Sequence, residues 1–393
     1  MLTAHVARVV HPLKSNQMPL IINNQESAIR LGGVFFILCY NSAMRQKVKG
    51  ITKKAVTVIL GAAMLLLCAC QSKDTKASTL AQEYNVSKEK QLIVYTSHKE
   101  EVYLPIIMEF ENQTGIHVEI HAGGTTEMFK EVREASKNSA CDIMFGGGIE
   151  SFEAASDLFI PYDTIDKDKL DQKYISKNGY WTPFTELPIV FVYNNKLVRK
   201  SEAPSSWEDL LNPKWKGQIA FADLHNSGTS YTILSAISQL YSEDELARFI
   251  KNLDNHVLSS SGDIIPYVSN GTFLVGITLE ETAKKNILAG DDITMVYPKD
   301  KTVSVPDGVS MVKNAPHSYN AGKFIDFVTG YDTQKYAMNR LSRRPVRTDI
   351  PLTIGYDVIE EMDYDIEKAA KDEETIFALW DLLIKKEEQD EIH

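Results

Sequence analysis

Residues 91–120 read QLIVYTSHKEEVYLPIIMEFENQTGIHVEI and combine two apolar runs with one amphipathic run. The apolar run at 92–95 is typical of a buried strand, and the run at 116–120 predicts a second strand. Between them, residues 100–114 follow helical spacing, and the side chains predicted to face inward are Val102, Ile106, Met108 and Phe110. Gly115 ends this helix, since glycine commonly follows the last helical residue. Such a unit predicts a parallel α/β sheet.

The same alternation of short apolar runs and amphipathic runs continues along the chain. We expect further strands at 142–145, 189–193, 217–222 and 273–278, and further helices at 127–136, 230–241, 243–252, 321–329 and 375–386. Because 393 residues exceed one ordinary hydrophobic core, two α/β lobes joined by crossing strands fit best, the first crossing lying near residues 189–195. The predicted lobes are residues 91–190 with part of 300–345, and residues 191–299 with part of 346–393.

An export segment precedes this body. A basic run begins after Met44, and an apolar run of about 13 residues follows at 55–67, too short for the about 20 residues of a membrane-spanning helix. It ends at Leu67-Cys68-Ala69-Cys70, which resembles the bacterial lipobox, whose last cysteine is acylated; a plain membrane anchor is the alternative. The predicted segments are a non-native extension at 1–43, a lipoprotein signal peptide at 44–69 and a polar tether at 70–90 that starts with the lipidated Cys70.

Charge and cysteine content exclude several classes of function. Basic residues predominate before residue 70, whereas residues 70–393 hold 34 basic and 52 acidic residues, a net charge of −18. Such a body is repelled by nucleic acids and by anionic lipid headgroups, so no nucleic-acid partner is expected. Cys141 is the one cysteine of the body after the tether, which rules out an internal disulfide or a CxxC metal site there. We expect its thiol to be buried as a small apolar group.

Small polar residues follow several of the predicted strands and open the next helix. In open α/β sheets ligands bind beyond the carboxyl ends of the strands, and helix N-termini there suit phosphate or carboxylate. A serine or threonine at a helix start is also an ordinary N-cap, so each loop alone leaves both interpretations open. The candidate ligand-binding residues are Ser97, His98, Thr125, Thr126, Gly147, Asp223, His225, Ser227, Gly228, Thr229, Ser230, Glu280 and Asp307.

Seven segments, taken in order, resemble extracellular solute-binding proteins of bacterial ABC importers, in the ferric-iron-binding-like branch. They are residues 110–116, 192–195, 204–210, 212–217, 270–276, 306–309 and 321–327, and the most specific pieces are Trp207-Glu208-Asp209-Leu210 and Pro213-Lys214-Trp215-Lys216-Gly217. The resemblance implies an α/β, two-lobed periplasmic-binding-protein-like fold with a hinge and a central cleft. It also implies a protein without catalytic activity that passes a small solute to a membrane permease. With the lipobox at Cys70, we expect a monomer without a cofactor that lies outside the cytoplasm and is tethered by lipid.

The nature of the solute is the finer question. Iron-binding members of the branch carry two tyrosines just after the strand that corresponds to residues 273–278, where this chain reads Leu279-Glu280-Glu281-Thr282. The strand followed by Glu280, the Ser-Gly-Thr-Ser loop at 227–230 and residues 343–347 more closely resemble relatives that bind sugar phosphates or aminoalkylphosphonates. Ser97, Thr125, Thr126, Ser227, Thr229 and Ser230 are predicted to hold the anionic head, and Glu280, Asp223 and His225 the polar remainder.

Two alternatives remain. One is a ferric-iron carrier, for which Tyr95, His98 and Glu280 are the candidate ligands. The other is an enzyme, which the chain disfavours because it lacks Gly-x-Ser-x-Gly, His-Glu-x-x-His and P-loop motifs. The arginines Arg343, Arg344 and Arg347 are candidates either for contact with an anion or for structural ion pairs.

Overall fold

The computed structural model describes residues 86–384, which belong to one compact unit of residues 78–393. The predicted extension, the signal peptide and the lipidation site at Cys70 lie outside the described residues, as does most of the tether. Within the described range, no helix is long and apolar enough to cross a membrane.

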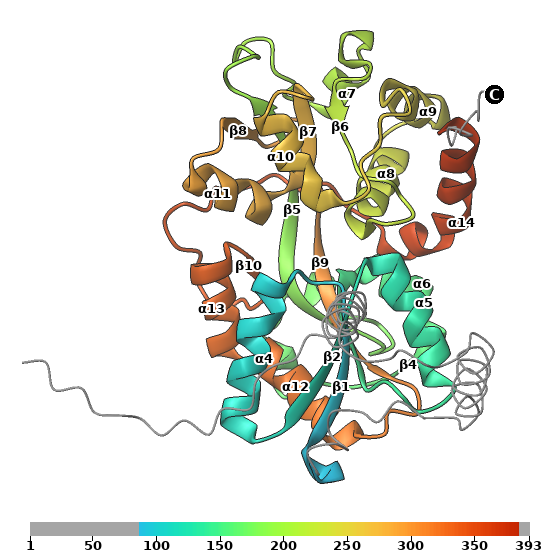
Figure 1. Cartoon of the computed structure of the whole chain (residues 1–393), viewed down its shortest axis with the longest axis vertical. Coiled ribbons are helices and arrows are strands. Elements are labelled where there is room, and N and C mark those ends of the chain that lie inside the picture. Colours follow the sequence, from blue (N-terminus) through green and yellow to red (C-terminus); the bar gives the residue numbers. More distant parts are fainter. Residues whose placement is uncertain (1–85, 385–393) are drawn as a thin grey trace, which may run out of the picture. The chain divides into compact units, whose positions relative to one another are not determined.

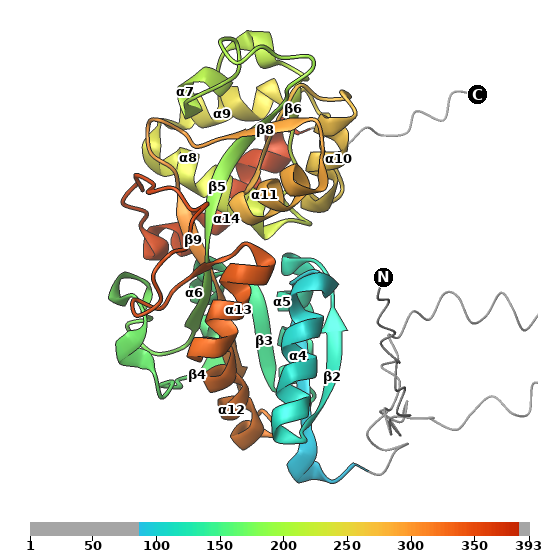
Figure 2. The same ribbon diagram turned by 90° about the vertical axis from the view of Figure 1, so that its left-hand side faces the viewer.

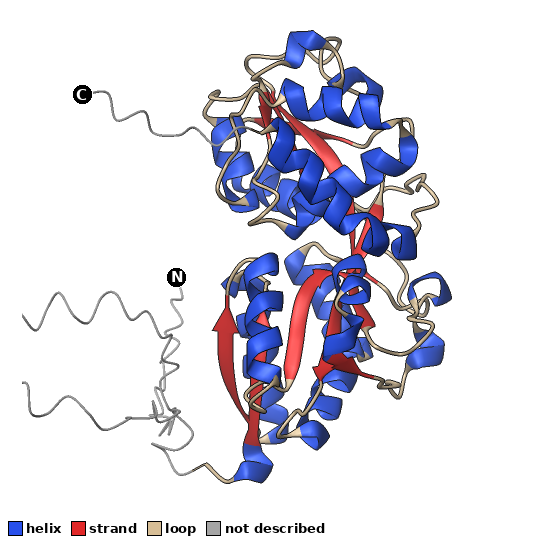
Figure 3. Cartoon of the chain, turned by 90° about the vertical axis from the view of Figure 1, so that its right-hand side faces the viewer, coloured by secondary structure: helices blue, strands red, loops and turns tan. Residues whose placement is uncertain are grey.

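The described residues form two α/β lobes (Figure 1). Lobe 1 contains β1 (Gln91–Thr96), β2 (His117–Ala122), β3 (Ile143–Gly148), β4 (Phe159–Ile160), α4 (Glu100–Thr114), α5 (Thr125–Ser136), α6 (Ile149–Ala154), α12 (Ser318–Thr329) and α13 (Tyr331–Leu341). Lobe 2 contains β6 (Ile219–Ala220), β7 (Val275–Leu279), β8 (Ile293–Val296), α7 (Trp207–Leu210), α8 (Gly228–Leu240), α9 (Glu243–Asn252), α10 (Ile264–Ser269) and α11 (Glu280–Ala289). Helices lie on both sides of the strands in each lobe (Figure 3).

Two long strands, β5 (Thr182–Asn194) and β9 (Ser304–Val312), pass from one lobe to the other (Figure 2). The strand order is β2-β1-β3-β9-β5-β7-β6. The first half of β5 pairs with β9, as in Glu186 opposite Pro306, and its second half pairs with β7, as in Phe191 opposite Ile277. The predicted crossing at 189–195 is therefore the end of a longer strand. The two-lobed fold with a hinge and a central cleft is confirmed, and the exact lobe boundaries stay a prediction.

The prediction of a parallel sheet holds for only part of the structure. Among the described strands, β1 is parallel to β2 and β3, and β6 is parallel to β7. The two crossing strands are antiparallel to their neighbours. No strand is predicted at β9 because Pro306, Asp307 and Gly308 interrupt its apolar run, although all nine of its residues are buried.

Helix α4 shows how local sequence sets the structure. It ends at Thr114, and Gly115 takes the left-handed conformation, φ 65°, that glycine adopts without steric cost. Phe110 packs edge-on against Phe324 of α12, with ring centroids 5.2 Å apart. Met108 was predicted to face inward, and this was wrong: it is 48% exposed, because it lies about 200° around the helix from Ile106.

Other boundaries follow from caps. Helix α9 has the predicted bounds, and its Ser242 N-cap accepts a hydrogen bond from the Glu245 N–H. The last helix, α14 (Ile366–Leu383), begins nine residues before the predicted 375, where the Asp365 side chain accepts from the Lys368 N–H. It packs on α6 of lobe 1 and on α8 and α9 of lobe 2. Cys141 is buried and free, as predicted.

Candidate functional site

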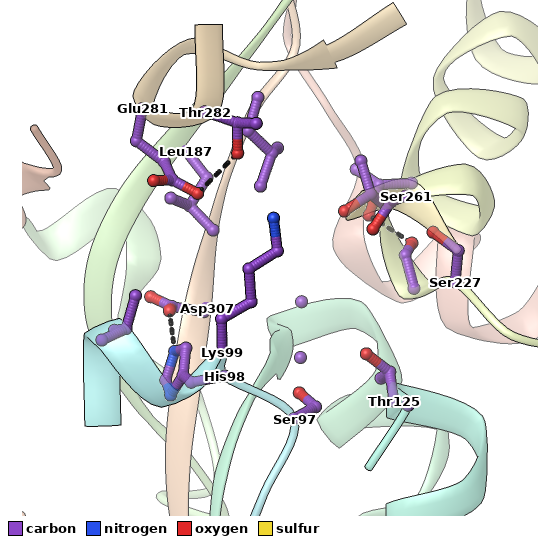
Figure 4. A pocket seen from close by; sticks show the side chains of 18 of the residues that line it. Ser97, His98, Lys99, Thr125, Leu187, Ser227, Ser261, Glu281, Thr282 and Asp307 are labelled. Carbon is purple, nitrogen blue, oxygen red and sulfur yellow. Dashed lines mark hydrogen bonds and ion pairs between the residues drawn. The ribbon is translucent and has the colours of Figure 1, made fainter. Parts of the chain in front are cut away.

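A cavity of about 470 Å³ lies between the two lobes, with walls from both of them (Figure 4). We call this cavity the pocket. The part of its lining with polar or small side chains comprises Ser97, His98, Lys99, Glu100, Tyr103, Ala122, Gly123, Gly124, Thr125, Gly147, Gly148, Asn226, Ser227, Gly228, Thr229, Thr232, Ser260, Ser261, Thr278, Glu281, Thr282, Asp307 and Arg343. The crossing strands supply apolar floor residues, among them Leu187, Ile189 and Val305. Its volume fits a small organic molecule.

Helix N-termini surround the pocket. The residues that precede four long helices all line it: Lys99 before α4, Gly124 before α5, Ser227 before α8, and Leu279 before α11. The first N–H groups of a helix have no partner within it, and the helix dipole adds a partial positive charge at that end. Starts of this kind from both lobes favour an anion between them.

The starts of α5 and α8 approach each other closely. A Cβ atom on Gly228 would lie 2.9 Å from the Thr125 Oγ1 atom, and one on Gly124 would lie 3.0 Å from the Asn226 carbonyl oxygen. Both separations are shorter than ordinary contacts, so a side chain at either position would have to displace its neighbour. The Ser227 hydroxyl accepts a hydrogen bond from the Ser230 N–H at 3.2 Å, which leaves its own proton to donate into the pocket.

His98 and Arg343 converge on one buried carboxylate. The Asp307 Oδ2 atom lies 2.5 Å from His98 Nε2 and also accepts from Arg343 Nη2. Its Oδ1 atom accepts from the Thr185 N–H and hydroxyl, at 2.8 and 2.9 Å. Burial favours the neutral form of Asp307, but Arg343 and His98 outweigh it and lower its pKa. Because its acceptor positions are occupied, Asp307 orients its neighbours.

Burial of the histidine in this cluster favours its neutral form. Burial lowers the pKa of His98, against the opposing effect of Asp307. A neutral ring that donates from Nε2 to Asp307 carries an acceptor at Nδ1. Arg343 donates from Nε to the Thr185 hydroxyl, whereas its Nη1 group has no hydrogen bond to any described residue. Because Arg343 lines the pocket, that N–H group is a candidate donor to a solute.

Lys99 brings a second cation. Figure 4 shows its side chain extended from lobe 1 into the pocket, between the wall of Glu281 and Thr282 and the wall of Ser227 and Ser261. Its ammonium group has no ion pair within the described part of the chain. The Glu281 carboxylate accepts from the Thr282 hydroxyl at 2.8 Å and offers an acceptor on the opposite side.

Comparison with known proteins places the chain in a family. The profile of bacterial extracellular solute-binding proteins matches residues 142–369, more than half of the chain. The chain belongs to this family. The binding protein is therefore the solute-binding component of an ABC importer that acts outside the cytoplasm, and its relatives are solute-binding proteins and not enzymes.

The relatives have different cargoes in their names. The binding protein is 24% identical to "Iron uptake protein A1" of Synechocystis sp. over 315 residues, which cover 76% of the chain and 86% of the relative. It is 23% identical to the "Putative 2-aminoethylphosphonate-binding periplasmic protein" of Salmonella typhi over 250 residues, 61% of the chain and 73% of the relative. The names thus leave the class of solute open.

Solved structures of binding proteins share the fold. The periplasmic binding protein P5PA is 25% identical and has a TM-score of 0.69, with 75% of this chain and 99% of that chain covered. AfuA from Actinobacillus pleuropneumoniae, with fructose-6-phosphate bound, is 23% identical with a TM-score of 0.70, and 75% of this chain and 98% of AfuA are covered. Iron-bound HitA from Pseudomonas aeruginosa is 18% identical, with a TM-score of 0.66 over 75% and 99% of the two chains.

The pocket of the binding protein brings together only part of the residues predicted from the sequence. Eight of them line it, and they are Ser97, His98, Thr125, Gly147, Ser227, Gly228, Thr229 and Asp307. Five others, Thr126, Asp223, His225, Ser230 and Glu280, are not among the residues that line it. The side chain of His225 lies 2.7 Å from Asp381 of α14, on the outside of lobe 2, and the Asp223 side chain accepts from the His225 N–H at 3.0 Å. Ser230 is buried one turn into α8.

Glu280 is committed to a buried ion pair. Arg344 donates to its two oxygens at 2.7 and 3.1 Å, Lys284 lies at 2.6 Å, and Tyr297 donates as well. Burial alone raises the pKa of Glu280, but the hydrogen bonds from Arg344 and Lys284 outweigh it and leave the pKa lowered. Of the two glutamates at this helix start, the one that lines the pocket is Glu281, the next residue along α11.

The three candidate iron ligands each have a different partner. Tyr95 stacks on His121 of β2 with ring centroids 4.4 Å apart, His98 is held by Asp307, and Glu280 by Arg344. Among the described residues, no group of three or more His, Cys, Asp or Glu side chains is placed to hold a metal ion.

Some residues that line the pocket were not among the predicted ligand-binding residues. Lys99 follows two predicted site residues directly, so its position at the same helix start was the available signal. Ser260 and Ser261 stand in a Ser-Ser-Ser-Gly loop whose polar composition was the signal for them. Arg343 was one of three arginines considered for contact with an anion, and what brings it rather than Arg344 or Arg347 to the pocket is its pairing with Asp307, 36 residues earlier.

Proposed function

We propose that the binding protein captures a small organic solute that carries a phosphate or phosphonate group and delivers it to its membrane permease. The convergence of the starts of α5 and α8 from opposite lobes carries this proposal. Each supplies free N–H groups and a hydroxyl, from Thr125 and Ser227, to the same region of the pocket. A tetrahedral anion with three acceptor oxygens matches donors that arrive from two directions.

The charges in the pocket support the same class of solute. The body has a net charge of −18, so an anion is held only where local donors outweigh the general field. Lys99, without an ion pair to the described residues, and the open N–H group of Arg343 supply two such donors. Glu281 is an acceptor suited to the hydroxyl or amino groups of the remainder of the solute.

The location of the protein completes the proposal. We infer that Cys70 is the lipid-anchored N-terminus, and that a monomeric two-lobed body remains beside its permease on a polar tether. Closure of the lobes on the solute is the signal that a permease of this class reads. Mass spectrometry of the membrane-bound protein tests the anchor, since a diacylglycerol-modified N-terminal Cys70 is expected and an unmodified cysteine would exclude it.

Ferric iron is the alternative cargo, and the name of the cyanobacterial relative favours it. A thermal-shift screen decides between a phosphorus-containing solute and ferric iron. Purified protein is heated with glucose 6-phosphate, 2-aminoethylphosphonate, inorganic phosphate or ferric citrate. A solute at about 100 times its dissociation constant stabilises the fold by about 2.7 kcal/mol and raises the melting temperature. A melting temperature unmoved by all three phosphorus compounds contradicts the proposal, and a phenolate charge-transfer band with ferric citrate establishes iron.

A further inference from the structure

Behind one wall of the pocket lies an acidic side chain that the proposed function does not use. Glu150, the second residue of α6 in lobe 1, is fully buried. Its Oε1 atom is hydrogen-bonded to the hydroxyl of Thr232, which belongs to α8 of lobe 2 and lines the pocket. Its Oε2 atom is buried and has no hydrogen-bond partner. A Cβ atom on the pocket-lining Gly148 would collide with the Glu150 carboxyl group, which therefore lies against the pocket wall.

The hydrogen bonds around Thr232 fit a protonated Glu150. The Thr232 Oγ1 atom lies 3.1 Å from the carbonyl oxygen of Gly228, the first residue of α8. A hydroxyl group has one proton, so an ionised Glu150 takes that proton and leaves the Gly228 carbonyl without it. When Glu150 is protonated, it donates to Thr232, and Thr232 donates to Gly228. Both contacts are then satisfied in one chain of hydrogen bonds.

The surroundings also favour the neutral acid. No ion pair reaches Glu150 from any described residue, and a buried carboxylate with an unpaired oxygen is costly. Of the elements packed on α6, α14 contributes Glu373, β9 contributes Asp307 (held by Arg343), and β3 contributes no titratable group. Tyr231 of α8 and Tyr364, just before α14, are the other titratable neighbours. Burial, with a smaller contribution from Glu373, raises the pKa of Glu150 to about 7.

We propose that Glu150 is a positioning residue which, in its protonated form, joins lobe 1 to lobe 2 through Thr232 and holds the start of α8 at the pocket. Loss of its proton removes the bond to Gly228 and places a negative charge beside the wall. The consequence for affinity rests on the proposed function, because only an anionic solute is repelled by that charge. The hydrogen bond to Thr232 and the protonation of Glu150 do not depend on the solute.

A ligand-free measurement tests the proton. Infrared difference spectra of wild type minus Glu150→Gln, recorded across a pH series, are expected to contain the carbonyl band of a buried carboxylic acid that disappears as the pH rises through about 7. The raised pKa means that the folded protein binds a proton which the unfolded chain has already lost. The resulting stabilisation is full at acid pH and is lost as the pH rises. The melting temperature of wild type should therefore fall relative to that of Glu150→Gln as the pH rises from the ordinary carboxyl pKa to about 7. Absence of the band, or a difference in melting temperature independent of pH, overturns the proposal.

A binding measurement tests the consequence. Calorimetry with glucose 6-phosphate and 2-aminoethylphosphonate compares wild type with Glu150→Gln, whose amide mimics the neutral acid. The ratio of the two dissociation constants cancels the titration of the solute itself. Between slightly acidic and slightly alkaline pH, we expect the affinity of wild type to fall about tenfold relative to that of Glu150→Gln. An unchanged ratio contradicts the effect on affinity. If neither compound binds at any pH, the proposed function fails, while the infrared and melting data still decide the role of Glu150.

Discussion

Two arginines that are neighbours in the chain, Arg343 and Arg344, form buried ion pairs in different regions of the molecule. Arg343 donates to Asp307, beside the pocket, and we call this the pocket pair. Arg344 donates to Glu280 at the start of α11, and we call this the α11 pair. The short strand β10 (Arg344–Pro345) pairs with β5 near Glu186. Side chains alternate between the faces of a strand, which sends the two arginines to opposite sides.

The α11 pair and the pocket pair are chemically similar, but only the pocket pair lines the cavity. In the α11 pair, both carboxylate oxygens are occupied by Arg344, Lys284 and Tyr297, and none of the pair lines the pocket. In the pocket pair, the carboxylate is equally occupied, but Arg343 keeps one N–H group for the cavity. We therefore expect the α11 pair to act on stability and the pocket pair to present a donor to the solute.

Breaking the α11 pair should have the largest effect on stability. Arg344→Met leaves Glu280 buried with only Lys284 as a charged partner, and removal of one member of a buried pair typically costs about 3–5 kcal/mol. Urea unfolding measures this loss. Because the folded pKa of Glu280 is lowered, the contribution of the pair is present above the ordinary carboxyl pKa and disappears as the pH falls below it. The double variant Arg344→Met/Glu280→Met should recover much of the loss; equal instability of both variants would contradict the ion-pair explanation.

Altering the pocket pair should lower the affinity for the phosphorylated probe. Arg343→Lys keeps a positive charge beside Asp307 but loses the planar fork that reaches both the carboxylate and the cavity. Loss of a hydrogen bond to a charged solute costs about 1.5–3 kcal/mol, so the dissociation constant for the phosphorylated probe should rise about tenfold or more. Calorimetry measures it. Arg347→Lys is the matched control, because Arg347 pairs with Asp166 and Asp349 away from the pocket and should leave affinity unchanged. An unaffected Arg343→Lys variant removes Arg343 from the binding site.

Lys99 sharpens the comparison, since it is a cation in the pocket with no carboxylate partner in the described range. Lys99→Met should leave the free energy of unfolding within experimental error and weaken binding of the phosphorylated probe about fivefold, as expected for an exposed charge. Added salt should weaken binding of the probe more in wild type than in Lys99→Met, because screening acts on exposed charges. Lys214→Met, on the ring of Trp215 and outside the pocket, is the control. Equal salt dependence in wild type and Lys99→Met argues against a contact between Lys99 and the anion.

Much of the fold could be predicted from the sequence, because it depends on local signals. Gly115 marks the end of α4, and the Ser242 cap marks the start of α9. Strand β9 was missed since a Pro-Asp-Gly sequence opposes strand formation, and only its burial between β3 and β5 makes it a strand. Tertiary contacts overrode local preference there.

The candidate site was less predictable than the fold because long-range contacts decide which side chains face the pocket. Helix starts such as Ser227-Gly228 carry a local signal, and they do line the pocket. Whether Glu280 or Glu281 faces the pocket depends on the rotation of α11, which is fixed by Arg344 from 64 residues away. The partner of Glu150 is likewise 82 residues distant, and nothing near Glu150 in the sequence distinguishes it from a solvated acid.

The smallest expected effect concerns the contact of the two lobes at the pocket. If the pocket side of the molecule governs affinity, then Gly228→Ala should weaken binding of the phosphorylated probe severalfold, because its Cβ would lie 2.9 Å from the Thr125 Oγ1 atom. Stability should change little, since alanine favours a helix by about 1 kcal/mol relative to glycine and offsets the crowding. Ser230→Ala, in the same turn but not lining the pocket, is the control and should bind as wild type does. A loss of stability without a loss of affinity in Gly228→Ala would place this contact with the α11 pair, as a structural junction rather than part of the binding surface.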